Sequence, residues 1–197
     1  PNTEMKIADD GEVLMRGRHV FKGYFKNDAA TKETIDEEGW LHSGDVGIID
    51  DRGFLKITDR KKELIITAGG ENIAPQVLEG KLKAIPVLSQ VVVIGDKRKY
   101  MTALFALDPE KVESAAAEAG SPAKTSAEAA KCEKFNAYIQ AKVDEVNKTL
   151  ARVQTIKKFT ILPQELSVEG EELTPTMKLK RRIVNEKYAN EIESMYA

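Results

Sequence analysis

Cysteine is almost absent from this sequence of 197 residues, which contains a single one, Cys132. One thiol excludes a disulfide framework within the chain and any metal site built from several cysteines. It also fits a reducing compartment. Cys132 belongs to a helical apolar pattern, so we interpret it as a core thiol rather than as a nucleophile.

Long apolar runs, a signal peptide and a strong charge of one sign are also missing. No run approaches the roughly 18 apolar residues of a membrane-spanning helix, and residues 1–12 are polar and acidic. The net charge of −2 provides no general attraction to nucleic acid or to an anionic membrane. We expect a cytoplasmic protein that binds no nucleic acid and has no metal site of its own. Peripheral attachment to a membrane stays open for the full-length protein.

The remaining composition is that of an ordinary globular protein, with 42% hydrophobic and 31% charged residues. Because Pro1 is not an initiator methionine, we expect the chain to begin inside a larger protein. Residues 12–16, 46–50 and 54–58 predict short strands, and a tight turn between the last two predicts a hairpin. Residues 27–37 predict a helix start, which either Asn27 or Asp28 can cap.

The pattern changes after a charged stretch at residues 59–63, which we interpret as a flexible linker. Strands are predicted at 64–67, 87–95, 101–108 and 156–162, and helices at 75–84, 110–119, 132–150 and 181–196. The helix at 132–150 is the clearest, because its apolar residues recur at spacings of three and four. We therefore predict an α+β fold, in which a small mixed sheet with packed helices follows a strand-rich part.

Three short stretches depart from this ordinary pattern. In the first, residues 39–45, Asp45 follows a glycine and can accept hydrogen bonds from a diol such as ribose, or it can cap a turn. The second, residues 59–72, combines charges with Gly69 and Gly70, which let a backbone approach a ligand closely. The third, around Lys178, fits either an anion site or a solvated helix start. Taken singly, each stretch leaves both interpretations open.

Together the stretches resemble the adenylate-forming superfamily, which includes acyl-CoA synthetases, luciferases and peptide-synthetase adenylation domains. Residues 11–24 resemble its "GE(L/I)…G…GY" segment, and residues 39–45 resemble "GW(L/F)(H/R)TGD". Residues 59–79 resemble "(D/G)RxKDxIxxxGxNIxPxEVE", and residues 173–181 resemble "P-x-(T/S)-x-K-x-x-R". The resemblance covers essentially the whole chain and identifies it as the C-terminal part of an AMP-forming acyl-CoA synthetase.

The resemblance implies a role for each candidate site residue. Asp45 would bind the ribose hydroxyls of ATP, Arg60 would reach the ribose or a phosphate, and Lys62 would lie at an interdomain hinge. The turn of Gly69, Gly70 and Glu71 would face the CoA channel, and Lys178 would be the catalytic lysine of adenylation. Residues 1–60 would end a large N-terminal domain, and residues 61–197 would form a mobile C-terminal lid domain.

The substrates implied are a fatty acid, ATP with Mg²⁺, and CoA. Met177, which replaces the family's usual glycine, and a helical insertion at 109–150 resemble long-chain fatty-acid–CoA ligases. The family's phosphate loop, adenine segment and acyl tunnel lie upstream, so we expect this chain to need the missing N-terminal domain and to be inactive alone. Two alternatives remain: an aryl-CoA ligase or peptide-synthetase adenylation module, and a stand-alone CoA- or nucleotide-binding regulatory module.

Overall fold

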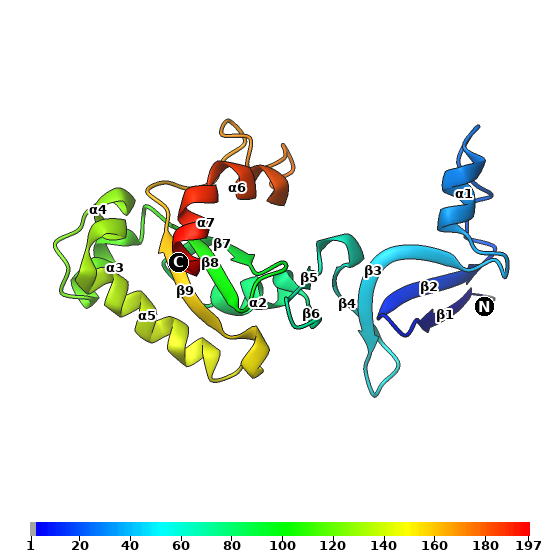
Figure 1. Cartoon of the computed structure of the whole chain (residues 1–197), viewed down its shortest axis with the longest axis horizontal. Coiled ribbons are helices and arrows are strands. Elements are labelled where there is room, and N and C mark those ends of the chain that lie inside the picture. The colour runs from blue at the N-terminus through cyan, green and yellow to red at the C-terminus, as the bar shows by residue number, and fades with distance from the viewer. Residues whose placement is uncertain (1–2) are drawn as a thin grey trace. The chain divides into compact units, whose positions relative to one another are not determined.

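The computed structural model describes residues 3–197 and divides into two compact units, shown in Figure 1. Unit 1 ends at Leu64, and unit 2 comprises Ile65–Ala197. Each unit has its own sheet and its own buried side chains, so each is described separately. Their roles as the end of a large domain and as a lid stay predictions.

Unit 1 is a four-stranded antiparallel sheet in the order β1-β2-β3-β4. The strands are β1 (Thr3–Ile7), β2 (Glu12–Gly17), β3 (Leu41–Ile49) and β4 (Leu55–Arg60). Helix α1 (Asp28–Thr34) connects β2 to β3, and the side chain of Asn27 caps it by accepting a hydrogen bond from the amide of Ala30. The predicted hairpin and the predicted helix start are therefore confirmed.

Three details of unit 1 differ from the predictions. Strand β1 was not predicted, because it has only five residues and nearly all of its side chains are exposed. Strand β3 starts at Leu41, so Asp45 lies inside a strand and not at its entrance. The stretch 59–63 has regular structure: Asp59 is buried, β4 extends to Arg60, and the short 3₁₀ helix η1 (Lys61–Glu63) follows, while its flexibility stays a prediction. The physical reason is a set of ion pairs made by Lys61, described below.

Unit 2 contains a three-stranded mixed sheet in the order β7-β8-β9. Strand β8 (Met101–Leu107) lies in the middle, antiparallel to β7 (Leu88–Ile94) and parallel to β9 (Ile156–Ile161). A small hairpin of β5 (Ile65–Ile66) and β6 (Asn72–Ile73) precedes it. The predicted α+β class with a small mixed sheet is confirmed.

Six helices pack on this sheet and bury both of its faces. They are α2 (Pro75–Leu82), α3 (Val112–Glu118), α4 (Ser126–Lys131), α5 (Glu133–Asn147), α6 (Arg181–Lys187) and α7 (Ala189–Tyr196). Side chains of β8 alternate between two apolar clusters, since Phe105 joins one with Phe135 of α5 and Leu104 joins the other with Val184 of α6. A strand covered on both faces explains the continuous apolar run of β8.

The helical predictions for unit 2 need two corrections. Helix α4 was not predicted, and the single helix expected at 181–196 is broken into α6 and α7 at Tyr188. Tyr188 is buried and its hydroxyl donates a hydrogen bond to the buried carboxylate of Glu172, so a tertiary contact explains the break. Helix α5 confirms the predicted apolar stripe, whereas Cys132 is only half-buried at its start.

Candidate functional site

Asp45 and Arg60, the two residues expected at the nucleotide, lie side by side. They are direct partners across β3 and β4, and Asp45 Oδ1 is 2.9 Å from Arg60 Nε. The Asp45 side chain is 32% exposed and that of Arg60 is 62% exposed. The ion pair is therefore open to solvent, and a ligand can compete for both groups.

A buried carboxylate organises the same end of unit 1. Glu12 of β2 accepts hydrogen bonds from Lys61 Nζ at 2.9 Å and from the amide of Gly44 at 2.9 Å, and His42 Nδ1 lies 3.0 Å from it. Lys61 Nζ is also 2.6 Å from Asp10 Oδ2. Burial acts to raise the pKa of Glu12, but the bonds from Lys61, His42 and Gly44 outweigh it and lower that pKa. These five residues are called the Glu12 network.

The Glu12 network fixes the residue that precedes the predicted hinge. Lys61 precedes Lys62. The hydrogen bonds from Lys61 to Asp10 and, second in size, to Glu12 raise the pKa of Lys61 and keep its ammonium charged. Lys62 follows directly in η1 and is exposed. A pivot at Lys62 would consequently start from a firmly held end of unit 1. Sequence reasoning missed the network, although Glu12 and Lys61 both lie inside the recognised motifs.

The predicted CoA-channel residues form the exposed tip of the β5–β6 hairpin, residues 67–71, called the glycine turn. The amide of Gly70 donates to the carbonyl of Thr67 at 2.9 Å, and the amide of Thr67 donates to the carbonyl of Glu71 at 3.1 Å. Gly70 has a φ of 82°, which glycine adopts without strain. A β-carbon built on Gly70 meets no atom within 4 Å. The turn therefore presents bare backbone to solvent.

Lys178 lies in an ordered loop, residues 173–180, called the Lys178 loop. Leu173 and Leu179 pair across its base, and the amide of Thr174 donates to the carbonyl of Lys178 at 2.8 Å. The amide of Lys178 donates to Thr174 Oγ1 at 3.0 Å, while the lysine side chain is exposed. Met177 has a φ of 61°, so it occupies a left-handed conformation that suits the glycine usual in the family.

Buried ion pairs flank the Lys178 loop on both sides, and sequence reasoning missed both. Before the loop, buried Glu172 accepts from Lys187 at 2.5 Å and from Tyr188. Burial acts to raise the pKa of Glu172, but the bond from Lys187 together with bonds from backbone amides outweighs burial and lowers that pKa. After the loop, Arg181 Nη2 lies 2.9 Å from both carboxylate oxygens of Glu79. Glu79 and Arg181 are the last residues of two of the recognised motifs and carry opposite charges. This pattern in the sequence could have predicted their ion pair.

The two candidate features of unit 2 are not brought together. In Figure 1 the Lys178 loop lies in the orange segment before α6, whereas the glycine turn belongs to the β5–β6 hairpin at a separate edge of the unit. The amide of Ala68 in the glycine turn donates to the carbonyl of Arg98, in the connection between β7 and β8. Unit 2 thus presents two distinct exposed surfaces.

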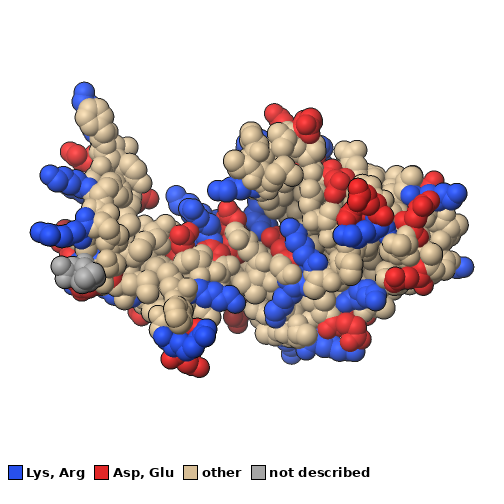
Figure 2. Space-filling model, turned by 180° about the vertical axis from the view of Figure 1, so that it is seen from behind, with Lys and Arg blue, Asp and Glu red and all other residues tan. Residues whose placement is uncertain are grey.

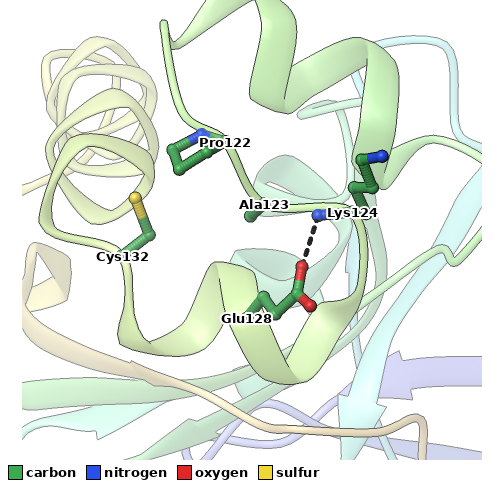
Figure 3. A pocket seen from close by; sticks show the side chains of 5 residues that line it. All are labelled: Pro122, Ala123, Lys124, Glu128 and Cys132. Carbon is green, nitrogen blue, oxygen red and sulfur yellow. Dashed lines mark hydrogen bonds between the residues drawn. The ribbon is translucent and has the colours of Figure 1, made fainter.

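The described residues contain other features that do not coincide with these candidates. A pocket of about 350 Å³, lined by Cys132 and by residues of the α3–α4 connection, contains none of them (Figure 3). Acidic and basic side chains are interspersed on the face that Figure 2 shows. Among residues 3–197, no helix is long and apolar enough to cross a bilayer, and no cluster of side chains suits a metal ion.

Residues 62–197 match the family described as the AMP-binding enzyme C-terminal domain. The chain belongs to this family. It is 45% identical over 197 residues to the long-chain-fatty-acid–CoA ligase FadD15 of Mycobacterium tuberculosis, covering 100% of this chain and 33% of that protein. It is 44% identical over 205 residues to the long-chain-fatty-acid–CoA ligase ACSBG2 of Gallus gallus, covering 95% of this chain and 27% of that protein.

Solved adenylate-forming proteins share the fold of this family member. The adenylation domain of a carboxylate reductase from Mycobacterium chelonae matches with a TM-score of 0.79 and 25% identity, over 100% of this chain and 31% of that domain. The O-succinylbenzoate CoA synthetase of Bacillus subtilis, solved with ATP and magnesium, matches with a TM-score of 0.62 and 27% identity, over 92% of this chain and 33% of that one. The chain spans about a third of the length of the curated relatives it matches first.

Proposed function

We propose that this chain is the C-terminal part of a long-chain fatty-acid–CoA ligase. The parent enzyme would join a fatty acid to ATP, releasing pyrophosphate and forming an acyl-adenylate, and would then transfer the acyl group to CoA with release of AMP. The observation that carries this proposal is an exposed, ordered loop presenting Lys178 on one surface of unit 2, while a bare glycine turn occupies another.

In the first step the carboxylate of the fatty acid attacks the α-phosphate of magnesium-bound ATP. Two anions must approach each other, and the ammonium of Lys178 would offset their repulsion by contacting oxygens of both. Asp45 would accept hydrogen bonds from the ribose hydroxyls, and Arg60 would exchange its bond to Asp45 for a ribose or phosphate oxygen. The exposure of the Asp45–Arg60 pair supports this role.

In the second step the CoA thiol displaces AMP from the acyl-adenylate. The glycine turn would line the channel for the pantetheine arm, because Gly69 and Gly70 have no side chains that would obstruct a narrow ligand. Since Lys178 and the glycine turn occupy separate surfaces of unit 2, one orientation of the unit cannot present both to a single active site (Figure 1). A rotation about Lys62 would exchange them.

The remainder of the active site would come from the part of the parent protein that this chain does not include. We propose that an N-terminal domain supplies the phosphate loop, the adenine contacts and the acyl tunnel. The 197 residues would then be inactive alone. We expect the parent enzyme in the cytoplasm, with the fatty acid, ATP and CoA as its small-molecule partners.

A second candidate is an adenylation module of another branch. The observation favouring it is the fold match to the adenylation domain of a carboxylate reductase. A panel of fatty, aromatic and amino acids tested on the full-length enzyme distinguishes the two. Preference for long-chain fatty acids supports the ligase, whereas preference for aryl or amino acids supports the alternative.

The first test replaces Lys178 with alanine in the full-length enzyme. Removing a charge that acts in the transition state should slow adenylation by about 10²–10³-fold. Thioester formation from preformed acyl-adenylate should remain intact, because the lysine would then be withdrawn. Stopped-flow measurement of each half-reaction checks this, with Arg182→Ala as a control that removes an exposed charge nearby. Equal damage to both half-reactions contradicts the assignment.

The second test concerns the glycine turn and the hinge. Gly70→Leu should raise the KM for CoA and spare adenylation, because a bulky side chain would enter the channel. Gly70→Ala is the matched control, since it carries the same backbone strain at a φ of 82° with little bulk.

Lys62→Pro should impair one half-reaction far more than the other by restricting φ at the pivot. Proportional loss of both steps together with lowered thermal stability would contradict the rotation.

A further inference from the structure

Arg181 and Glu79 form a buried ion pair between segments far apart in the sequence. Their side chains are 20% and 11% exposed, and the hydrogen bonds between them span 102 residues. Arg181 is the first residue of α6 and ends the segment that carries Lys178. Glu79 is a buried residue of α2, the helix that follows the glycine turn and β6. The pair therefore joins the segments that carry both candidate features of unit 2.

The edge of the sheet gives this pair a third attachment. Strand β7 is at the edge of the β7-β8-β9 sheet, and the amide of Val93 donates to Glu79 Oε1 at 2.9 Å. Arg181 Nη1 lies 3.5 Å from the carbonyl of the same residue. Carboxylate and guanidinium thus bind the two backbone groups that β7 directs away from the sheet. Residue 181 cannot shift without breaking bonds to both α2 and β7.

We propose that Glu79 and Arg181 are positioning residues that hold Lys178 at the place required for adenylation. This inference rests on the proposed role of Lys178. A buried ion pair is weak support for stability alone, because apolar replacements are often neutral or stabilising. Its location at the end of the Lys178 loop gives it a specific consequence: the loop and the glycine turn stay at a constant separation when unit 2 rotates.

The two flanking ion pairs anchor opposite ends of the Lys178 loop. Glu172, with Lys187 and Tyr188, attaches the start of the Lys178 loop to the second apolar cluster and to the junction of α6 and α7. The hydrogen bonds of that set stay within the C-terminal segment, and apolar packing carries it to the sheet. The Glu79–Arg181 pair instead bonds the end of the loop directly to α2 and to β7.

The experiment compares Arg181→Met with Arg182→Met in the full-length enzyme. Both changes remove one positive charge from the start of α6, but the Arg182 side chain is 77% exposed and bonds only locally to Glu186. Misplacement of a catalytic group by about 1 Å can cost on the order of 10²-fold. We expect Arg181→Met to slow adenylation by up to that factor and to leave thioester formation from preformed acyl-adenylate unchanged. Arg182→Met should change neither step.

Two further variants separate positioning from simple stability. Glu79→Gln keeps an acceptor for the amide of Val93 and should show the same selective loss of adenylation. This variant tests the inference even if Arg181→Met folds poorly. The double variant Lys178→Ala/Arg181→Met should adenylate no more slowly than Lys178→Ala alone, because Arg181 acts only through Lys178. Arg181→Lys should adenylate faster than Arg181→Met but more slowly than the unchanged enzyme, since lysine restores the positive charge but lacks the planar guanidinium group.

The outcomes distinguish this inference from the proposed function. If Lys178→Ala impairs adenylation selectively but Arg181→Met and Glu79→Gln spare it, the positioning inference is wrong and the proposed function stands. Equal losses in both half-reactions, or additive losses in the double variant, also overturn the inference. If Lys178→Ala itself leaves adenylation intact, the proposed function fails first.

Discussion

Different interactions stabilise the interior of each unit. Unit 2 has two apolar clusters, one on each face of its sheet, with Phe135 and Leu104 fully buried in them. In unit 1, over the described residues, the buried apolar side chains are only Val13, Leu14 and Trp40. Trp40 lies beneath the cations of Lys6 and Arg16, at 4.2 and 4.5 Å from its ring centre. A buried carboxylate of this unit, Glu12, holds three of its segments through the Glu12 network.

The exposed apolar side chains of unit 1 sharpen the contrast. Ile48 and Ile49 of β3, Ile57 of β4 and Phe54 in the turn between these strands are all more than 40% exposed, and Phe25 is 89% exposed. A sheet that leaves such residues in water usually packs against further chain. Unit 2 has apolar clusters of its own, as the proposed rotation requires. Unit 1 has the features of a part whose partner lies elsewhere, and its stability should depend on polar contacts.

The largest expected effect tests the independence of the unit 2 core. Phe135→Ala should lower the free energy of unfolding of unit 2 by about 3–5 kcal/mol, because it leaves a cavity in a fully packed cluster. Far-UV circular dichroism in denaturant follows this transition, while the fluorescence of Trp40, the single tryptophan, reports unit 1. The fluorescence transition should not move. Coincident shifts of both probes would show one cooperative body, and the exposed Phe25→Ala serves as the control.

The next effect tests the polar support of unit 1. Glu12→Gln should lower the free energy of unfolding of unit 1 by about 1–3 kcal/mol, because Lys61 loses its buried ionic partner. The Trp40 fluorescence transition should move to lower denaturant while the far-UV transition of unit 2 stays in place. Glu4→Gln, which removes an exposed ion pair with Arg16, should have a smaller effect. An unchanged fluorescence midpoint in Glu12→Gln would show that the Glu12 network does not stabilise unit 1.

Acidification provides a related test. The pKa values of Glu12 and Asp10 are lowered from 4.5 and 3.8, Glu12 by bonds that outweigh its burial and Asp10 chiefly by Lys61. Their stabilisation is therefore complete above about pH 4.5 and is lost as pH falls through the lowered values in the folded state. The Trp40 fluorescence midpoint should fall steeply below that pH. Glu12→Gln should flatten this dependence, and an equally steep decline in the variant would contradict the assignment.

The smallest effect concerns the Lys178 loop of unit 2. Met177→Gly removes a left-handed strain of about 1–2 kcal/mol and adds an entropic cost of roughly 0.5–1 kcal/mol. Met177 is 65% exposed, so little burial is lost. We expect a small rise in the free energy of unfolding of unit 2, measured by far-UV circular dichroism. A decrease would show that the methionine side chain contributes contacts that outweigh the strain.

Local features of the sequence predicted much of this fold. The apolar spacing that predicted α5, the tight turn of the β3–β4 hairpin and the Asn27 cap all depend on residues close together in the chain. The motifs likewise selected Asp45 and Lys62, which lie in β3 and η1, and Gly70 and Lys178, which lie on exposed loops. Strand β1 and helix α4 escaped prediction because they have only five and six residues, too few to establish an apolar period.

The tertiary structure decided how these local parts are held. The bond from Lys61 to Glu12 spans 49 residues, and the bond from Arg181 to Glu79 spans 102. Similarly, Tyr188 interrupts a continuous helical pattern because its hydroxyl binds buried Glu172. A charged residue has the same local pattern whether it is solvated or buried in an ion pair, since only the folded chain brings its partner near. The sequence alone therefore determined most of the elements and the candidate residues, whereas the fold decided which charged residues form buried ion pairs.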